Sequence, residues 1–453
     1  MRQSQNRFLG AVIIITGLMA SCKKTDVKGD TLTTPSPTSS SNLKDTALSY
    51  TRDIYLWADK IPASVTASSF TDLSAMMTGI RQYSIEPGFN GPVDRWSFAV
   101  KQAEWDKVSS GVAGDFGLGV FFRSESDLRV KSVEAASPAG RAGIHRGWRI
   151  VKLNGSSNIS TSNTDLVVKA VFEASNTTFT FQKPDGSNVD ITLNAATYQE
   201  NPVILDSVYA VAGKKIGYFV FNSFLGDTTQ IYNSFNRIFS KFSSFGLNDV
   251  IIDLRYNGGG YVSIQEKLAN YLAPLSANGQ LMMKQQFNAA NASYNSTDYF
   301  HKLGALNLSR IFFIVSKSTA SASELLINNL KPYMDVILVG PGNTYGKPVG
   351  FFPIPVGDEY IFPVSFKTTN KNGDGSYFNG LTLNKSVADG LDKDWGDLAE
   401  GPFAKAVSYI TTGDFGTIAG RENVATPAAV LKGNATLDLP AFKGAIDTRG
   451  LTH

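Results

Sequence analysis

The sequence predicts an α/β protein, and three patterns along its 453 residues support that class. Between residues 198 and 413, continuous apolar runs alternate with segments of helical period, which is typical of a core built on a largely parallel sheet. Residues 109–197 contain shorter runs separated by turn residues, which predict a small β domain. Residues 44–108 place apolar side chains near helical spacing, which predicts a small helical N-terminal domain.

The first residues have the layout of a secretory signal. "MRQSQNRFLGAVIIITGLMASCKK" carries two arginines, an apolar stretch over residues 8–20 and small residues before Cys22. The apolar stretch is short for a membrane span. "MASC" resembles a bacterial lipobox, which implies that residues 1–21 are removed and that Cys22 carries a lipid in the cell envelope. Cys22 is the only cysteine, so an intramolecular disulfide is impossible; the alternative is a buried or incidental cysteine.

Composition predicts a linker after this segment and argues against one class of partner. Residues 25–43 are rich in Thr, Ser, Pro and Gly with almost no bulky side chain, so they cannot bury enough surface to order themselves, and residues 22–43 are assigned as a linker. The net charge is +3 and no block of basic residues occurs, so nothing favours nucleic-acid binding. Residues 414–453 carry little pattern and are assigned as a C-terminal tail.

Two segments predict the helices of the N-terminal domain. "LKDTALSYTRDIYLWADKI" places apolar residues loosely on one face. "SSFTDLSAMMTGIRQY" begins with good N-cap residues and places Leu73, Met76, Met77 and Ile80 near helical spacing.

Five runs predict the strands of the β domain, at residues 117–122, 128–133, 149–155, 177–183 and 189–195. Helices are expected at 137–144 and 163–174. This order, with "GLGV" opening one strand and "SPAGRAGIHRGWRIVKLNG" following, resembles a PDZ domain, although Trp148 stands where that family often has Asp. The resemblance implies that a peptide C-terminus adds as a strand beside Gly117, Leu118, Gly119 and Val120. The alternative is a small β domain that only packs.

The predicted core strands include "KIGYFVFNSF", "DVIIDLRYNGGG", "IFFIV" and "DVILVG", with helices between them. Functional groups of open α/β sheets gather where strands end. Three strands end in the suggestive sequences "DLRYNGGG", "SKSTASASE" and "GPGNTYGK".

The serine-rich segment allows two interpretations. Ser321 and Glu324 form an S-x-x-E pattern before an apolar helix, which predicts a capping box. Ser321 could instead be a nucleophile, which needs a base. Of the three histidines, His301 is the one candidate, and its surroundings do not suggest a base. Lys347 lies among Gly, Pro and apolar residues, where loss of water could leave it neutral near pH 7.

The glycine turn that begins at Asn257 could supply an oxyanion hole. Acyl transfer needs preorganised N–H donors, each worth about 3 kcal/mol. Glycine lets the backbone approach a substrate carbonyl closely. The alternative is a plain tight turn after a strand.

Taken together and in this order, "DLRYNGGG", "STASASELL" and "VGPGNTYGK" behind a PDZ-like domain resemble the C-terminal processing (tail-specific) peptidases. The resemblance spans roughly residues 44–410 and implies a crotonase-like (ClpP/crotonase) α/β core with an inserted PDZ domain. It further implies Ser321 as nucleophile, Lys347 as base, and the amides of Ala322 and of Gly259 or Gly258 as oxyanion donors. The family's third residue is an Asp at the position of Pro332 or a Gln after the lysine. Neither is present here, so this residue is not identified.

The sequence therefore predicts a lipid-anchored serine endopeptidase of the cell envelope that acts on proteins or peptides with apolar C-termini. A second hypothesis is a degenerate peptidase that serves as a PDZ-bearing peptide-binding lipoprotein. A third is an acyl-group enzyme acting on a thioester, for which a coenzyme site is lacking. No metal or cofactor is expected. "NKNGDGSYFNGL" imitates a calcium loop, but Leu381 replaces the bidentate Glu that such a loop needs.

Overall fold

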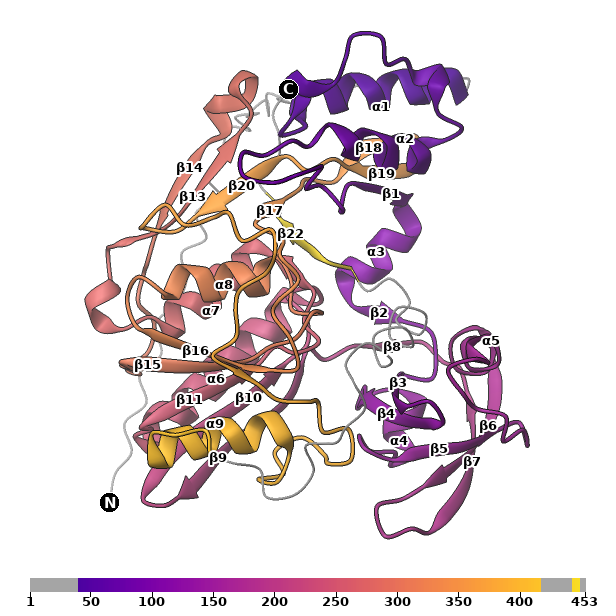
Figure 1. Cartoon of the computed structure of the whole chain (residues 1–453), viewed down its shortest axis with the longest axis vertical. Coiled ribbons are helices and arrows are strands. Elements are labelled where there is room, and N and C mark those ends of the chain that lie inside the picture. The colour runs from indigo at the N-terminus through magenta and orange to yellow at the C-terminus, as the bar shows by residue number, and fades with distance from the viewer. Residues whose placement is uncertain (1–39, 417–441, 449–453) are drawn as a thin grey trace, which may run out of the picture.

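The computed structural model describes residues 40–416 and 442–448 (Figure 1). The predicted signal segment, Cys22 and nearly all of the predicted linker lie outside the described residues, as does most of the predicted tail. In the described part of the chain, no helix is both long enough and apolar enough to cross a membrane.

A six-stranded sheet forms the centre of the core, in the order β21-β16-β15-β11-β10-β9. Its strands are β9 (Val203–Val211), β10 (Lys214–Phe221), β11 (Asp249–Asp253), β15 (Arg310–Ile314), β16 (Asp335–Gly340) and β21 (Lys385–Ser386). All neighbouring pairs are parallel except β9 and β10, which are antiparallel. The predicted α/β core with a largely parallel sheet is confirmed.

Helices cover both faces of this sheet, which explains why its strands read as continuous apolar runs. Three helices pack on one face: α6 (Thr228–Phe245), α7 (Val262–Leu272) and α8 (Ala322–Leu330). The helix α9 (Gly401–Thr412) packs on the other. Successive residues of β11 point to opposite faces, so Ile252 joins the first cluster whereas Ile251 joins the second.

Two smaller sheets lie above the core in Figure 1. One has the order β14-β13-β20-β17 and the other β1-β19-β18. Their strands are β1 (Phe98–Lys101), β13 (Leu281–Phe287), β14 (Ser296–Tyr299), β17 (Val349–Gly350), β18 (Ile354–Val356), β19 (Glu359–Phe362) and β20 (Phe366–Thr369).

The N-terminal region packs onto these sheets rather than around a core of its own. Its helices are α1 (Ser40–Ile54), α2 (Leu73–Ile80) and α3 (Gln102–Ser110), with short 3₁₀ turns at Ala58–Lys60, Ala67–Ser69 and Arg81–Tyr83. The predicted helices are present, but the region also contributes strand β1, where Phe98 stacks on Phe362 of β19 with ring centroids 4.4 Å apart. Its buried residues belong to the same hydrophobic cluster as the core helices.

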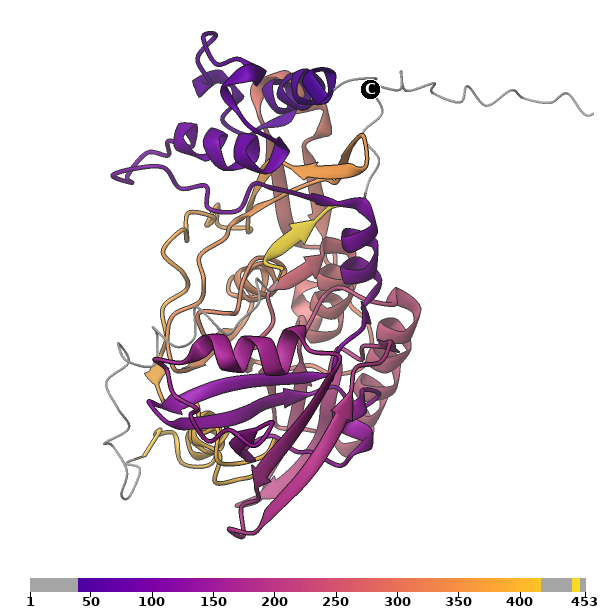
Figure 2. The ribbon, with the colours of Figure 1, turned by 90° about the vertical axis from the view of Figure 1, so that its right-hand side faces the viewer.

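The predicted β domain folds around a separate hydrophobic cluster and lies beside the core in Figure 1 and in front of it in Figure 2. Its strands are β3 (Leu118–Ser124), β4 (Asp127–Val133), β5 (Arg149–Leu153), β6 (Asn176–Gln182) and β7 (Asn188–Asn194). Helix α4 (Pro138–Arg141), helix α5 (Thr164–Val168) and a π-helical turn (Lys169–Glu173) complete it. Strands β2 (Val112–Ala113) and β8 (Tyr198–Gln199) pair where the chain enters and leaves the domain.

A buried ionic network joins the β domain to the core. Arg146 of the β domain is 3% exposed and donates to the Tyr256 hydroxyl and to Asp389 of the core. Arg255 is fully buried and donates to Asp389 at 3.0 Å and to Glu400 at 2.6 Å. Burial opposes ionisation of Asp389, but the two guanidinium groups outweigh it and lower the pKa of that carboxyl. The charges are therefore paired, as buried charges must be.

Candidate active site

Ser321 occupies a strained turn between strand β15 and helix α8. Its backbone has φ +56° and ψ −109°, a region that residues with a side chain rarely adopt. A sharp, strained strand-to-helix turn is also how hydrolases present a nucleophilic serine. The residue is only 1% exposed, and its Oγ lies 3.4 Å from the carbonyl oxygen of Val349.

The carboxylate of Glu324 ties the serine turn to the lysine turn. It accepts hydrogen bonds from the Ser321 N–H (2.8 Å), the Gly346 N–H (2.6 Å) and the Lys347 N–H (2.8 Å). It also accepts from the Thr344 hydroxyl at 2.5 Å. Burial raises the pKa of Glu324, and these four donors oppose that rise. The capping residue predicted from sequence thus also fixes the position of the lysine.

Lys347 is buried with its amine in an apolar pocket. The side chain is 1% exposed, and Nζ lies 3.3 Å from the centroid of the Phe351 ring and 5.7 Å from that of Trp96. Burial lowers the pKa of Lys347 well below its usual value, and the charges of Asp94 and Glu324 oppose this shift only in part. Nζ donates one hydrogen bond, to the carbonyl oxygen of Lys443 at 2.7 Å.

The glycine turn lies against the serine turn. The Asn257 carbonyl accepts from Ala320 N–H and from the Ser323 hydroxyl, each at 3.1 Å. Gly259 has φ +105°, and a Cβ there would lie 3.0 Å from the Ala322 nitrogen, so only glycine fits. The Gly259 N–H is held by the Asn257 side chain at 2.9 Å. Within the described residues, the N–H groups of Gly258 and Ala322 have no protein acceptor.

The fold therefore brings the predicted serine, lysine and glycine segments together. Ser321 Oγ contacts the segment that carries the lysine, at Val349, but no hydrogen bond joins the Ser321 and Lys347 side chains. Proton transfer between a serine hydroxyl and a lysine amine requires the two groups to come within hydrogen-bond distance. Catalytic contacts often tighten only when substrate binds.

Two contributors to the site were missed by sequence reasoning. Glu324 was interpreted as a helix cap, and the sequence contains no signal for its bonds to the lysine turn, which lies about twenty residues further along the chain. Lys443 falls in a region to which no structure was assigned, yet its carbonyl is the acceptor for the Lys347 amine.

The "GLGV" segment lies at the edge of the β domain. Strand β3 is the terminal strand of its sheet and pairs only with β4 there. The Gly117 N–H donates to Asp115 at 2.7 Å, and the Gly117 carbonyl accepts from the Glu134 N–H at 3.0 Å. Burial, together with the nearby charges of Glu200 and Asp115, raises the pKa of Glu134 to about 7. The outer edge of β3 therefore pairs with no further strand of this sheet, and several acidic groups lie near its start.

The described ranges hold no group of three or more His, Cys, Asp or Glu side chains placed to bind a metal ion. The buried carboxylates Asp253, Asp389 and Glu400 pair instead with Arg146 and Arg255.

Comparison with known proteins agrees with the geometry. Residues 215–383 match the model of peptidase family S41. This part of the chain is a peptidase family S41 domain. It contains the glycine turn, Ser321 and Lys347.

The S41 domain has curated relatives and a solved structural neighbour. The chain is 29% identical over 260 residues to a protein of Staphylococcus aureus named "Probable CtpA-like serine protease", covering 56% of this chain and 49% of that one. A protein of the same name from Staphylococcus saprophyticus is 26% identical over 257 residues, with the same coverage. The chain thus spans about half the length of these relatives. A crystal structure titled "Putative S41 protease from Bacteroides fragilis" has a TM-score of 0.67, 22% identity, and coverage of 81% of this chain and 97% of that chain.

Proposed function

We propose that the chain is a serine endopeptidase that uses Ser321 as nucleophile and Lys347 as general base. The burial of Lys347 carries this proposal. An amine buried against aromatic rings, with a strongly lowered pKa, gives up its proton more readily than an ordinary lysine and can then accept one from a hydroxyl. The strained backbone of Ser321 and the shared Glu324 carboxylate support the pairing.

The proposed reaction has two halves. Lys347 Nζ takes the proton of the Ser321 hydroxyl as Oγ attacks a peptide carbonyl, and the N–H groups of Gly258 and Ala322 bind the oxyanion that forms. Collapse breaks the C–N bond, and the lysine returns the proton to the leaving amine. Water then attacks the acyl-enzyme with Lys347 again as base, and Ser321 is regenerated. The Gly259 N–H already donates to the Asn257 side chain, so the Gly258 N–H is the one assigned to the oxyanion hole.

The substrates in this proposal are proteins or peptides with apolar C-termini. The open edge of β3 suits β-strand addition by such a tail, next to Gly117, Leu118, Gly119 and Val120. The buried network through Arg146 and Arg255 links this PDZ-like domain to the start of the glycine turn. The lipobox-like "MASC" supports attachment to the cell envelope through lipidated Cys22.

Purified wild type, Ser321→Ala and Lys347→Ala proteins would test the proposal. Cleavage of a model protein with an apolar C-terminal tail is expected from the wild type and lost in both variants, with circular dichroism spectra unchanged. A fluorophosphonate probe should label wild type at Ser321. Full cleavage by either variant would refute the pair.

The competing function is a peptide-binding lipoprotein without catalysis. The open β3 edge and the lack of a hydrogen bond between Ser321 and Lys347 are the observations that favour it. Binding of the tailed protein, with neither cleavage nor probe labelling of the wild type, would select this function.

A further inference from the structure

A short segment from the far end of the chain lies in the candidate active site. Residues 442–448 are described, and strand β22 (Gly444–Ile446) runs parallel to strand β12 (Gly259–Tyr261), which continues the glycine turn. In Figures 1 and 2 this strand passes between the core helices and the upper sheets. The carbonyl of Lys443 is the acceptor for the Lys347 amine.

Backbone hydrogen bonds hold the segment from both sides. On the side of the glycine turn, the Gly444 N–H donates to the Gly258 carbonyl at 3.1 Å. On the other side, the Phe351 N–H donates to the Ala445 carbonyl at 3.0 Å, and the Asp447 N–H donates to the Phe351 carbonyl at 3.2 Å. The segment thus fills a slot between β12 and Phe351 as an added β-strand.

The walls of the slot are glycines. A Cβ at Gly258 would collide with the Phe442 carbonyl, and one at Gly259 would collide with the Gly444 carbonyl. A Cβ at Gly350 would lie 2.8 Å from the Ala445 carbonyl. Glycine is used where another backbone approaches closely. These walls therefore let the main chain of the segment approach closely.

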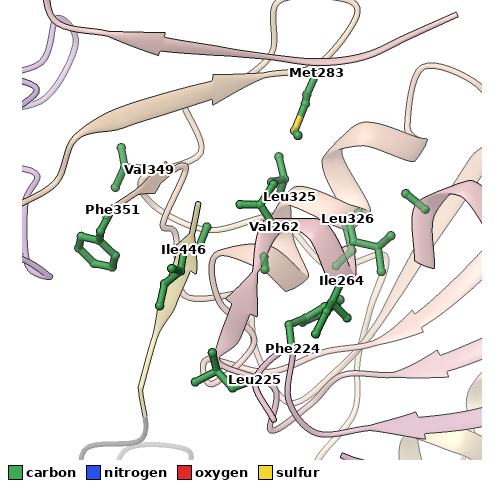
Figure 3. Packing of buried hydrophobic residues seen from close by; sticks show 14 of the residues in the cluster. Phe224, Leu225, Val262, Ile264, Met283, Leu325, Leu326, Val349, Phe351 and Ile446 are labelled. Carbon is green, nitrogen blue, oxygen red and sulfur yellow. The ribbon is translucent and has the colours of Figure 1, made fainter. Parts of the chain in front are cut away.

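Side chains fix the register of the segment. Ala445 is 3% exposed and Ile446 is 1% exposed. Figure 3 shows Ile446 beside Val349 and Phe351, all within the core cluster. Phe442 packs edge-on against Trp105 with ring centroids 5.1 Å apart. The slot thus takes small residues next to the glycine turn and one branched apolar residue after them.

We propose that the slot between β12 and Phe351 is a binding site for an extended peptide, and that the chain's own residues 442–447 occupy it. The ligand class is a peptide strand with two small residues followed by a β-branched apolar residue. The inference rests on the proposed peptidase function, because it makes this slot the path of the substrate strand past Ser321 and Lys347. Main-chain hydrogen bonds supply affinity and the Ile446 pocket supplies preference.

Occupation by the tail has a consequence for activity. Ser321 and Lys347 are each 1% exposed, so a substrate must open the site before it reacts. A segment of the same chain reaches the slot in an intramolecular step, so its effective concentration does not depend on the concentration of the protein. The apparent affinity of an external peptide is its intrinsic affinity multiplied by the fraction of molecules whose slot is free. The tail is therefore an intramolecular competitor of the substrate.

The test measures peptide binding by the full-length chain in a Ser321→Ala background, so that cleavage plays no part. The probe is a fluorescent peptide with the sequence of residues 441–448, AFKGAIDT. Ile446→Asp should expel the tail, because a carboxylate does not fit the apolar pocket. This variant is expected to bind the peptide at least about ten-fold more tightly than its parent in fluorescence anisotropy. Ile446→Val, which keeps a branched apolar side chain, should bind like the parent.

Peptide chemistry and stability provide the controls. The peptide AFKGADDT, with Asp at the position of Ile446, should bind neither protein. If Ile446→Asp lowers the melting temperature, AFKGAIDT should raise it again, because binding to the folded state stabilises it. Phe442→Ala loosens the tail without adding a charge and should bind the peptide with intermediate affinity.

The proposed peptide site would be wrong if the parent, Ile446→Asp and Phe442→Ala proteins bound the peptide equally and the peptide did not raise their melting temperature. Peptide binding in Ile446→Asp combined with no probe labelling of Ser321 in the protein that retains this serine would instead count against the peptidase function. The two failures are therefore distinguishable.

Discussion

The replacement Glu324→Gln should separate the serine turn from the lysine turn. One carboxylate oxygen accepts from the Ser321 and Lys347 N–H groups, and the other accepts from the Gly346 N–H and the Thr344 hydroxyl. An amide keeps one oxygen and turns an NH₂ group toward the other two donors. Each buried donor left without an acceptor costs about 1–3 kcal/mol.

Part of this loss is offset, because burial raises the pKa of Glu324 and the amide avoids desolvating a charge. The expected net loss in free energy of unfolding is about 2–4 kcal/mol. In the proposed mechanism the rate of probe labelling at Ser321 should also fall, since the turn that carries the nucleophile is no longer fixed relative to Lys347.

Urea denaturation followed by circular dichroism measures the first effect, and labelling kinetics of the folded protein measure the second. Glu125→Gln is the matched control, because Glu125 is exposed and this change should stay within about 0.5 kcal/mol of wild type. If Glu324→Gln were as stable as Glu125→Gln and labelled at the wild-type rate, the hydrogen bonds of Glu324 to the serine and lysine turns would have no role in the site.

Three further changes test charge and burial. Because burial lowers the pKa of Lys347, the folded state loses a proton that the unfolded state keeps up to about pH 10.5, so the free energy of unfolding rises with pH between the folded-state pKa and about 10.5. The value of kcat/KM should rise with pH and reach its plateau well below pH 10.5. Lys347→Met should be inactive and more stable in urea at pH 7. Ionisation of Glu134, whose pKa is raised to about 7, adds a negative charge near Asp115, which holds the Gly117 N–H, so a peptide C-terminus should bind more weakly at pH 8 than at pH 6, and Glu134→Gln should remove this difference in isothermal titration calorimetry. Arg255→Met leaves three carboxylates without their central partner and should lower the free energy of unfolding by about 3–5 kcal/mol, measured by thermal and urea unfolding.

The features predicted from sequence are those with a local physical signature. Strand β11 reads as an uninterrupted apolar run because both of its faces are buried. Ser321 and Lys347 became candidates because each follows an apolar strand with an unusual local composition, and parallel strands bring their carboxyl ends to one edge. The five strands of the β domain were predicted for the same local reason.

The missed features depend on contacts between distant residues. Strand β1 lies in a region whose sequence pattern predicts helices, and its strand conformation comes from pairing with β19, more than 250 residues later. Arg146 reads as an ordinary surface arginine until it is placed against Asp389, 243 residues away. Lys443 contributes a backbone carbonyl, and every residue type has one, so no sequence pattern can mark it.

The tail contact also explains how so short a strand could compete with substrate in the proposed function. The backbone hydrogen bonds of the segment, which include its ladder with β12, and the Lys347 bond are each worth about 0.5–1.5 kcal/mol net, which an external peptide could equal. An external peptide must in addition lose its translational and rotational freedom, a cost estimated at about 4 kcal/mol or more. The tail has met most of that cost through its covalent attachment to the chain. A substrate therefore displaces the tail only if it makes additional contacts outside the slot. The edge of β3, which pairs with no further strand, is a part of the described surface that could provide such contacts.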